Sequence, residues 1–243
     1  MDECVEWISE EFGVDVGPWT IYRVLERAKY THKVASKHSK FRNNELRDHW
    51  FAKTRTFRAD QIVAINKSAA NERTSERRRG WAPVNTECVA SYNTVRTPRW
   101  SVLPAMTVDG YLDWEVIPGG YTKELFEAFI INKVLPKCQP WPAPRSILIM
   151  DNASQHDIPR LRAICGTVGV KVEQLPPYSP DYNPIEQSFH ILKMWIRRNW
   201  QLMSLFSDLG EFLEHGIRSC MYRKDCWGMY RRCGYQDEAV GLV

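Results

Sequence analysis

The stretch SILIMD, Ser146 to Asp151, is a short apolar run that ends on a carboxylate. A wholly apolar run of this length is typical of a central strand that is covered on both faces of its sheet. Asp151 then stands at the carboxyl end of the strand, at the edge of an open α/β sheet where ligands usually bind. It could equally cap the following turn together with Asn152 and Ser154, and this stretch alone does not decide between the two roles.

The segments on either side of this strand predict the rest of one α/β domain. Upstream, QIVAIN (61–66) indicates a first strand, and two more strands within 99–119 are joined at Asp109-Gly110, a turn that favours a hairpin. The remaining expected elements are a helix capped by Thr122, a helix over 157–169, a strand over 170–175 and a helix that begins at Pro184. This order predicts a mixed sheet with helices on both faces, the ribonuclease-H-like arrangement.

Length and composition indicate a folded protein with one substantial core. The chain has 243 residues, 44% of them hydrophobic, which suffices for an α/β core and a small accessory unit. It has no apolar run of about 18 residues, and its acidic start lacks the order of a signal peptide. We therefore expect an intracellular protein, no membrane partner, and reduced cysteines. The C-terminal group of His215, Cys220, Cys226 and Cys233 lacks the close spacing of structural zinc sites, so we expect thiols without a metal.

The N-terminal segment has the pattern of a helix-turn-helix unit. Apolar residues at helical spacing in 2–12 are followed by a glycine-containing turn and by a second helix that begins at Pro18. In such a unit the second helix enters the major groove of DNA. A generic pair of antiparallel helices fits the pattern as well. The candidate DNA contacts are Thr20, Tyr22, Arg23, Arg27 and Lys29.

Positive charge is concentrated between residues 20 and 58, although the formal net charge of the chain is only +4. This segment contains eleven lysines and arginines and three acidic residues. Such an excess is typical of a protein that binds a polyanion, and a solvated helical face would produce it too. We divide the chain into a partial helix-turn-helix unit (1–34), a basic linker (35–58), a ribonuclease-H-like domain (59–200) and a C-terminal helical extension (201–243).

Glu186 is a second candidate for a metal-binding carboxylate. It opens the helix after Pro184, where an acidic residue is also favoured by the helix dipole. Together, Asp151 and Glu186 could share Mg²⁺, and two such ions can activate the attacking oxygen and stabilise the leaving oxygen in phosphodiester cleavage. A two-ion site normally needs a third carboxylate on the neighbouring strand. The strand 61–66 is the expected neighbour, and the residue at its end is Asn66.

Two sequence blocks carry a resemblance to a known family. IMDNASQH (149–156) and LPPYSPDYNPIE (175–186) resemble the catalytic blocks of mariner-like DDE transposases of the Tc/mariner superfamily. The 34 residues between Asp151 and Glu186 match the branch of that family that ends in glutamate. The similarity extends over roughly residues 5 to 200, and it includes a likeness of the N-terminal segment to the second of the family's two helix-turn-helix units.

The resemblance implies a site, a cofactor and a partner. Asp151 and Glu186 would be the second and third metal ligands, and Asn152 and His156 would lie beside them or contact substrate. The implied cofactor is a pair of Mg²⁺ or Mn²⁺ ions, and the implied reaction is cleavage and transfer of DNA strands at transposon ends. The implied partner is terminal-inverted-repeat DNA, with a homodimer as a further candidate assembly, no small-molecule substrate, and a nuclear location in a eukaryote. Residues Tyr178, Ser179, Asp181, Asn183 and Pro184 would mainly fix the loop that places Glu186.

Two departures from the family pattern limit that inference. Family members usually have a first acid in a D-E-S triplet where this chain reads Asn66-Lys67-Ser68. An asparagine offers one neutral oxygen and an NH₂ group that cannot face a cation, and Lys67 adds a positive charge nearby. The chain also begins at or just before the second helix-turn-helix unit, so half of the expected DNA reader lies outside it.

Three hypotheses follow from these departures. The first, which we favour, is a DNA-binding protein with the transposase fold whose catalysis is impaired by Asn66. An active enzyme would need a substitute acid, for which Glu72, Asp109 and Asp157 are candidates, whereas Asp60 lies at the far end of the first strand, roughly 20 Å away. A decayed transposon relic without a present role is the third hypothesis.

Overall fold

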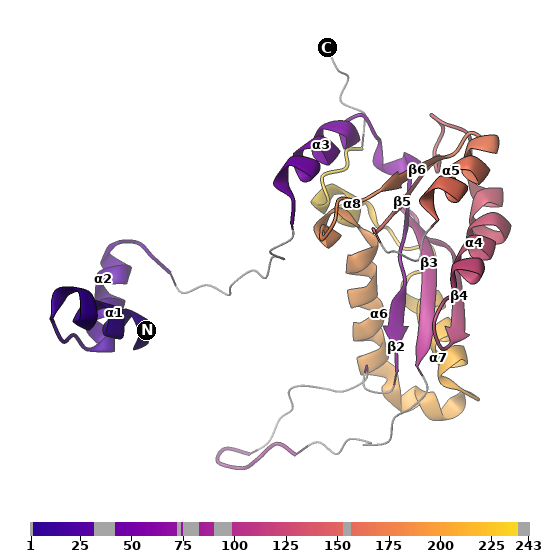
Figure 1. The fold of residues 1–243 in the computed structure, drawn as a ribbon. Coiled ribbons are helices and arrows are strands. Elements are labelled where there is room, and N and C mark those ends of the chain that lie inside the picture. The colour runs from indigo at the N-terminus through magenta and orange to yellow at the C-terminus, as the bar shows by residue number, and fades with distance from the viewer. Residues whose placement is uncertain are drawn as a thin grey trace. The chain divides into compact units, whose positions relative to one another are not determined.

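The computed structural model describes residues 2–31, 42–71, 74, 83–89, 99–152 and 157–237. The chain forms two compact units, Met1–Lys40 (the N-terminal unit) and Phe41–Val243 (the larger unit), and each is described by itself (Figure 1). Within the described residues, no helix combines the length and the apolar character needed to cross a membrane.

The N-terminal unit consists of helices α1 (Asp2–Phe12) and α2 (Pro18–Arg27). Gly13 has a positive φ of 62°, which lets the chain turn after α1, and Pro18 occupies the first turn of α2. Ile21 of α2 is buried. The predicted helix, glycine turn and second helix are therefore present as helix-turn-helix elements.

The larger unit is built on a mixed sheet whose order is β4, β3, β1, β5, β6. β1 and β5, and β5 and β6, pair in parallel, whereas β3 is antiparallel to β1, β2 and β4. β2 follows β1 on the same side of β3, so these two short strands act as one interrupted strand. The strands are β1 (Ile62–Ile65), β2 (Ser68–Ala70), β3 (Trp100–Thr107), β4 (Gly110–Pro118), β5 (Ile147–Met150) and β6 (Lys171–Gln174).

A tight turn joins β3 to β4, as the sequence predicts. Thr107 pairs with Gly110, and Gly110 has a φ of 103°, in the region that favours glycine. A Cβ atom at Gly110 would lie 2.4 Å from the backbone oxygen of Met221. Glycine is therefore required here both by the turn and by the close approach of the C-terminal segment.

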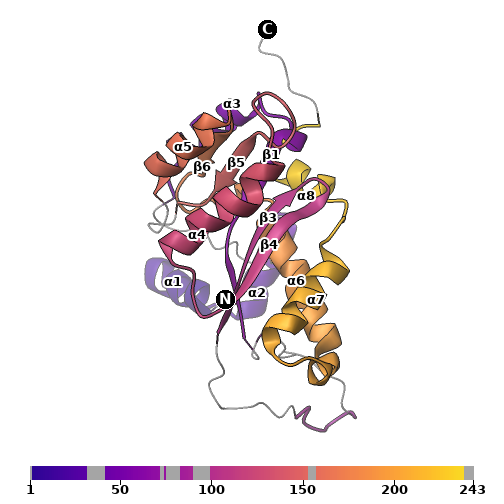
Figure 2. The same cartoon turned by 90° about the vertical axis from the view of Figure 1, so that its right-hand side faces the viewer.

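Helices cover both faces of the sheet, as Figure 2 shows. Side chains alternate along β1, so Ile62 and Ala64 join one core cluster while Val63 and Ile65 join the other. The second cluster lies under α4 (Lys123–Phe129), with the continuing turns Ile130–Val134 and Leu135–Lys137, and under α5 (Ile158–Thr167). The first lies under α6 (Ile185–Asn199), α7 (Leu209–Cys220) and α8 (Trp227–Arg232). This arrangement confirms the predicted α/β fold with a mixed sheet between two helical layers.

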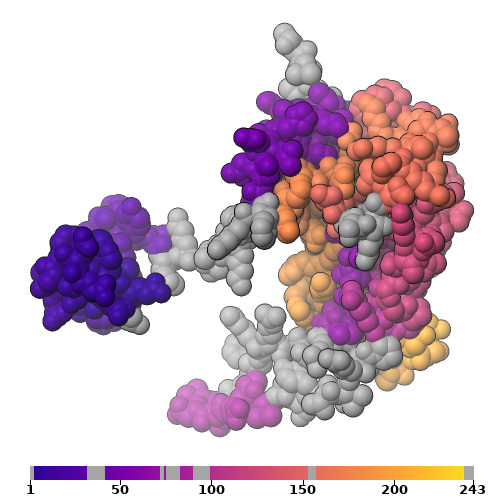
Figure 3. Space-filling model, in the orientation of Figure 1, coloured from indigo at the N-terminus to yellow at the C-terminus, as the bar shows by residue number. Residues whose placement is uncertain are grey.

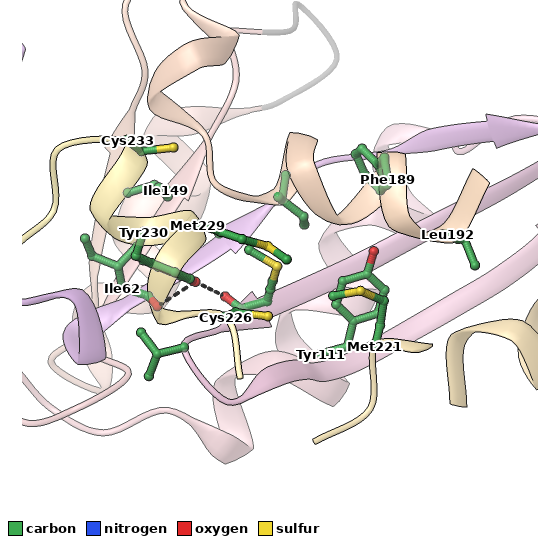
Figure 4. Packing of buried hydrophobic residues seen from close by; sticks show 14 of the residues in the cluster. Ile62, Tyr111, Ile149, Phe189, Leu192, Met221, Cys226, Met229, Tyr230 and Cys233 are labelled. Atoms are coloured by element: carbon green, nitrogen blue, oxygen red, sulfur yellow. Dashed lines mark hydrogen bonds between the residues drawn. The ribbon is translucent and has the colours of Figure 1, made fainter. Parts of the chain in front are cut away.

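The predicted C-terminal extension completes the first core cluster. It contains a 3₁₀ segment at Trp200–Leu205 followed by α7 and α8. The buried Tyr230 of α8 donates its hydroxyl to the backbone oxygens of Met106, at 2.6 Å, and of Ile62, at 3.4 Å (Figure 4). The last helix thus packs directly on the central strands, which the sequence alone did not indicate.

Part of the segment predicted as a linker over 35–58 belongs to the larger unit. Residues 44–54 form helix α3 (Asn44–Thr54), capped by the side chain of Asn43, and the 3₁₀ turn Ala59–Gln61 leads into β1. Trp50 and Phe57 are buried in the first core cluster. Figure 3 shows the side chains of α3 lying against the rest of the larger unit. The aromatic residues of this basic segment make it part of the packed domain.

Candidate active site and DNA-binding helix

Asn66 and Asp151 follow the ends of two neighbouring parallel strands. In the register of β1 and β5, Ile65 lies opposite Met150, so the next residue of each strand reaches the same edge of the sheet. Continued alternation directs both side chains toward the α6 face and Lys67 toward the opposite face. The expected neighbourhood of the first two site positions is therefore present.

Glu186, in the first turn of α6, completes the group. Its Oε1 accepts a hydrogen bond of 2.7 Å from Nδ2 of Asn66, although the two residues are 120 positions apart. All three residues line one pocket of about 400 Å³. The other residues that line it are Asn152, Leu175, Pro176, Pro177, Tyr178, Ser179, Pro180 and Asn183.

The electrostatics of the pocket disfavour a charged Glu186. Burial raises the pKa of the Glu186 carboxyl, and the negative charge of Asp151 adds to this effect. The hydrogen bond from Asn66 and the charge of Lys193 act in the opposite direction, but the pKa remains above the ordinary glutamate value. Two carboxyl groups are thus held close enough to interact, and the partner of Glu186 is an amide.

The residues present do not fit the implied pair of divalent ions. The NH₂ group of Asn66 faces Glu186, and its Oδ1 accepts the backbone N–H of Lys67 at 2.7 Å. Both polar ends of the amide are thereby engaged within the protein, and an NH₂ group cannot ligate a cation. In the part of the chain that the structure describes, no group of three or more His, Cys, Asp or Glu side chains could hold a metal ion.

Comparison with known families identifies the larger part of the chain. Residues 61–207 match the family described as DDE superfamily endonuclease. The chain belongs to this family. Residues 1–54 match a second family, described as winged helix-turn helix. A search of curated proteins gives no match.

Solved structures show the same fold for this DDE superfamily chain. The structure titled "Mos1 transposase paired-end complex with left transposon end" has a TM-score of 0.58 and 15% sequence identity, covering 98% of this chain and 80% of the other. The "Mos1 mariner paired end complex with Mn" has a TM-score of 0.61 and 14% identity over 96% and 75% of the two chains. The corresponding complex with Mg has a TM-score of 0.59 and 14% identity, over 94% and 72%. At these identities the likeness shows a common fold.

The candidate substitute acids of this DDE superfamily chain have other environments. Asp157 caps α5 by accepting the backbone N–H of Arg160 and pairs with Lys123 at 3.0 Å. Asp109 lies in the β3–β4 turn, where its backbone N–H donates to Thr107. Glu72 lies outside the described residues. Neither of the two described acids lines the pocket of Asn66, Asp151 and Glu186.

Of the two residues expected beside the metal ligands, Asn152 and His156, the structure describes only Asn152. Asn152 lines the pocket, and its Oδ1 accepts a hydrogen bond from Gln174 at the end of β6. His156 lies outside the described residues. The sequence reasoning did not include Gln174, although the parallel pairing of Met150 with Gln174 brings it to the same edge.

Lys193 is a second residue that the sequence reasoning missed. It stands seven positions after Glu186 on α6, a spacing of two helical turns that places both residues on one face. Its charge lowers the pKa of Glu186, in the direction expected of a nearby cation. The spacing of seven residues on one predicted helix is a signal in the sequence that could have identified Lys193.

The loop before α6 contains the residues expected to place Glu186. Tyr178 has a positive φ of 54°, and Pro180–Tyr182 forms a 3₁₀ turn. The backbone oxygen of Asn183 accepts the N–H of Glu186 at 3.2 Å. The helix start is thus tied to the loop through its own backbone.

The candidate DNA contacts lie on or just beyond α2. Thr20, Tyr22, Arg23 and Arg27 are exposed on the helix, and Lys29 is exposed two residues past its end. Helix α1 has the opposite charge: its sequence, DECVEWISEEF, contains five acidic residues and no basic one. Of the two helices, only α2 therefore presents a surface suited to a polyanion.

Proposed function

We propose that this chain is a transposase-derived, mariner-like DNA-binding protein whose metal-dependent strand cleavage is impaired. The observation that carries the proposal is the engagement of the Asn66 amide with Glu186 and with the backbone of Lys67. In the two-ion mechanism a bridging carboxylate would hold both cations at this position. Here the group at that position donates a hydrogen bond to the carboxylate that should bind the metal.

The proposed partner is DNA, bound through α2 of the N-terminal unit. Four exposed polar or basic residues of α2 and Lys29 suit contacts to phosphates and to base edges in the major groove. Transposon-end DNA as the target is supported by the resemblance and by the structural likeness to a Mos1 complex with a transposon end. The proposed homodimer and the nuclear location in a eukaryote rest on the resemblance alone. Mg²⁺ or Mn²⁺ remains the cofactor of the ancestral reaction, with Asp151 and Glu186 as its proposed remaining ligands.

A plasmid-nicking assay tests the loss of cleavage. We expect no nicking by the natural chain in Mg²⁺ or Mn²⁺. The double variant Asn66→Asp, Lys67→Glu restores the acids at both positions, and we expect it to nick DNA unless Asp151→Ala is added. Nicking by the natural chain that is abolished by Asp151→Ala would overturn the proposal.

A further inference from the structure

The position of Glu186 depends on the loop that precedes α6. Glu186 is the second residue of the helix, and Pro184 before it has no side-chain acceptor to cap the first turn. The first turn is instead connected to Asn183 and through it to the 3₁₀ turn Pro180–Tyr182. Whatever holds this turn therefore also sets the place of the Glu186 carboxyl.

Arg47 of α3 holds the turn through two parallel hydrogen bonds. Its Nη1 lies 3.0 Å from Oδ1 of Asp181, and its Nη2 lies 2.6 Å from Oδ2. The same guanidinium stacks on the ring of Tyr182, with 4.1 Å between its central carbon and the ring centroid. Arg42 adds a longer ion pair to Asp181 at 3.5 Å. A planar bidentate contact of this kind fixes orientation as well as distance.

Burial and charge distinguish this pair from an ordinary surface ion pair. The side chain of Arg47 is only 7% exposed, whereas that of Asp181 is 51% exposed. Partial burial opposes ionisation of Asp181, but the hydrogen bonds and charge of Arg47 outweigh it and lower the pKa of Asp181. The hydrogen bond to Asp181 in turn raises the pKa of Arg47. The pair is thus fully charged at neutral pH.

The C-terminal segment holds the other side of the turn. The hydroxyl of Tyr235, a buried residue, donates to the backbone oxygen of Tyr182 at 2.8 Å. The turn is therefore held between a helix from the start of the larger unit and a residue near its end. Of these two contacts, the Arg47 contact is made by side chains alone, and Arg47 is not a member of the apolar core cluster to which Tyr235 belongs.

We propose that Arg47 is a positioning residue for Glu186, acting through Asp181 and the Pro180–Tyr182 turn to keep the carboxyl within reach of the Asn66 amide. Glu186 and Asn66 touch each other, whereas Arg47 acts at a distance through the loop. The inference rests on the hydrogen-bonded pair in the pocket and is independent of whether the chain binds or cleaves DNA. It assigns a site role to a helix that the sequence indicates only as a basic linker.

The same segment offers a matched control. Arg58 forms a bidentate pair with Asp60, with its Nε and Nη2 at 2.9 and 3.0 Å from the two carboxylate oxygens. This pair precedes β1 and, among the described residues, forms no hydrogen bond or ion pair with the loop before α6. Arg47→Gln and Arg58→Gln therefore remove the same kind of interaction, and only the first should affect Glu186.

Nuclear magnetic resonance of the full chain tests the proposal through two signals: the side-chain amide of Asn66 and the backbone amide of Glu186. In Arg47→Gln we expect the Asn66 side-chain signal to move toward that of a solvated asparagine, and the Glu186 backbone signal to shift as its hydrogen bond to Asn183 lengthens. Arg47→Lys, which keeps the charge but not the planar fork, should give an intermediate shift. Arg58→Gln should leave both signals unchanged.

The result that would overturn the proposal is a folded Arg47→Gln chain with both signals unchanged. Equal displacement of the signals by Arg58→Gln would also overturn it, because the effect would then be general destabilisation. If Arg47→Gln does not fold, Asp181→Asn provides the same test from the other partner, with Asp60→Asn as its control. DNA binding and cleavage are not read in this experiment, so failure of the proposed function would not imitate failure of this inference.

Discussion

Asn66 carries a side-chain amide where an aspartate would carry a carboxylate, and this difference changes which ligands the pocket can bind. With two carboxyl groups and one amide, the pocket keeps its arrangement without a cation, because Asn66 donates directly to Glu186. A third carboxylate would instead place like charges together, which is favourable only when a cation is present to share. The stability of a variant with a carboxylate at position 66 should therefore depend on divalent ions.

We expect Asn66→Asp to lower the free energy of unfolding by about 1–3 kcal/mol in metal-free buffer, since a hydrogen bond to a charged group is lost and a charge is added. Mn²⁺ at 100 times its dissociation constant should then raise the free energy of unfolding of this variant by about 2.7 kcal/mol. Thermal unfolding with and without Mn²⁺ measures both effects. Asn66→Ala removes the amide without adding an acid, and it should show no response to the ion. A Mn²⁺ response of equal size in Asn66→Ala would contradict this expectation.

Glu186 should limit stability at neutral pH. Its pKa in the folded chain is raised, so its favourable contribution is complete below the unfolded pKa and is lost as pH rises through the folded pKa. Glu186→Gln keeps the acceptor for Asn66 and removes the charge beside Asp151. We expect it to stabilise the fold by about 1 kcal/mol at pH 7.

Urea unfolding at several pH values measures this gain. It should shrink as the pH falls below the ordinary glutamate pKa, because Glu186 is then protonated in both folded and unfolded chains. A gain that does not change with pH would show that the charge of Glu186 is not its cause.

The sequence predicts the members of the site better than the contacts between them. The placement of Asn66 beside Asp151 follows from the order of strands, and the first-turn position of Glu186 follows from Pro184. By contrast, the Arg47–Asp181 pair joins residues 134 positions apart on elements of different predicted domains. No local pattern specifies such a pair, since it depends on how α3 packs on the larger unit.

Among the elements, α8 is short but makes hydrogen bonds to the centre of the sheet. It has six residues, yet its Tyr230 hydroxyl is bonded to backbone oxygens of two central strands. The sequence predicts a helical extension over 201–243 but does not give the bounds of α8, because its pattern is too short for a clear helical period. The longer helices α4, α5 and α6 were predicted correctly, and the N-cap at Thr122 and the start of α6 after Pro184 lie where expected.

We expect Tyr230→Phe to lower the free energy of unfolding by about 1–3 kcal/mol, because it leaves the buried oxygen of Met106 without this donor. For a chain of this size each kcal/mol corresponds to roughly 2–4 °C in the melting temperature. Differential scanning calorimetry measures the shift. Tyr222→Phe, at an exposed tyrosine of the same segment, is the control and should change stability by less than about 0.5 kcal/mol. Equal effects of the two substitutions would argue against a role for the Tyr230 hydroxyl.

For the whole molecule, the uneven distribution of charge matters more than its sum. The net charge of +4 is small, but the exposed arginines of α2 are presented on one short helix. Phosphate contacts release bound counterions, so DNA affinity should fall steeply as salt rises. The N-terminal unit should supply most of this dependence.

We expect Arg23→Gln and Arg27→Gln each to reduce the slope of log affinity against log salt by about 1. Fluorescence anisotropy with a labelled duplex between 50 and 200 mM salt, roughly the range over which phosphate contacts weaken strongly, measures the slope. Arg160→Gln in the larger unit, where Arg160 pairs with Glu127, is the control and should leave the slope unchanged. A smaller slope of log affinity against log salt in Arg160→Gln alone would indicate that the DNA-binding surface lies on the larger unit.

The hydrogen bond between Tyr230 and Ile62 also bears on folding during synthesis. These residues are 168 positions apart, so β1 leaves the ribosome long before its last partner has been made. At a translation rate of about 5–20 residues per second, the delay is roughly 10–30 s. During that interval the apolar strand β1 lacks its contact with α8. A nascent chain that stops before α8 therefore contains every strand but has an incomplete core over one face of the sheet, and we expect it to be recognised by chaperones and proteases rather than to persist as a shorter working protein.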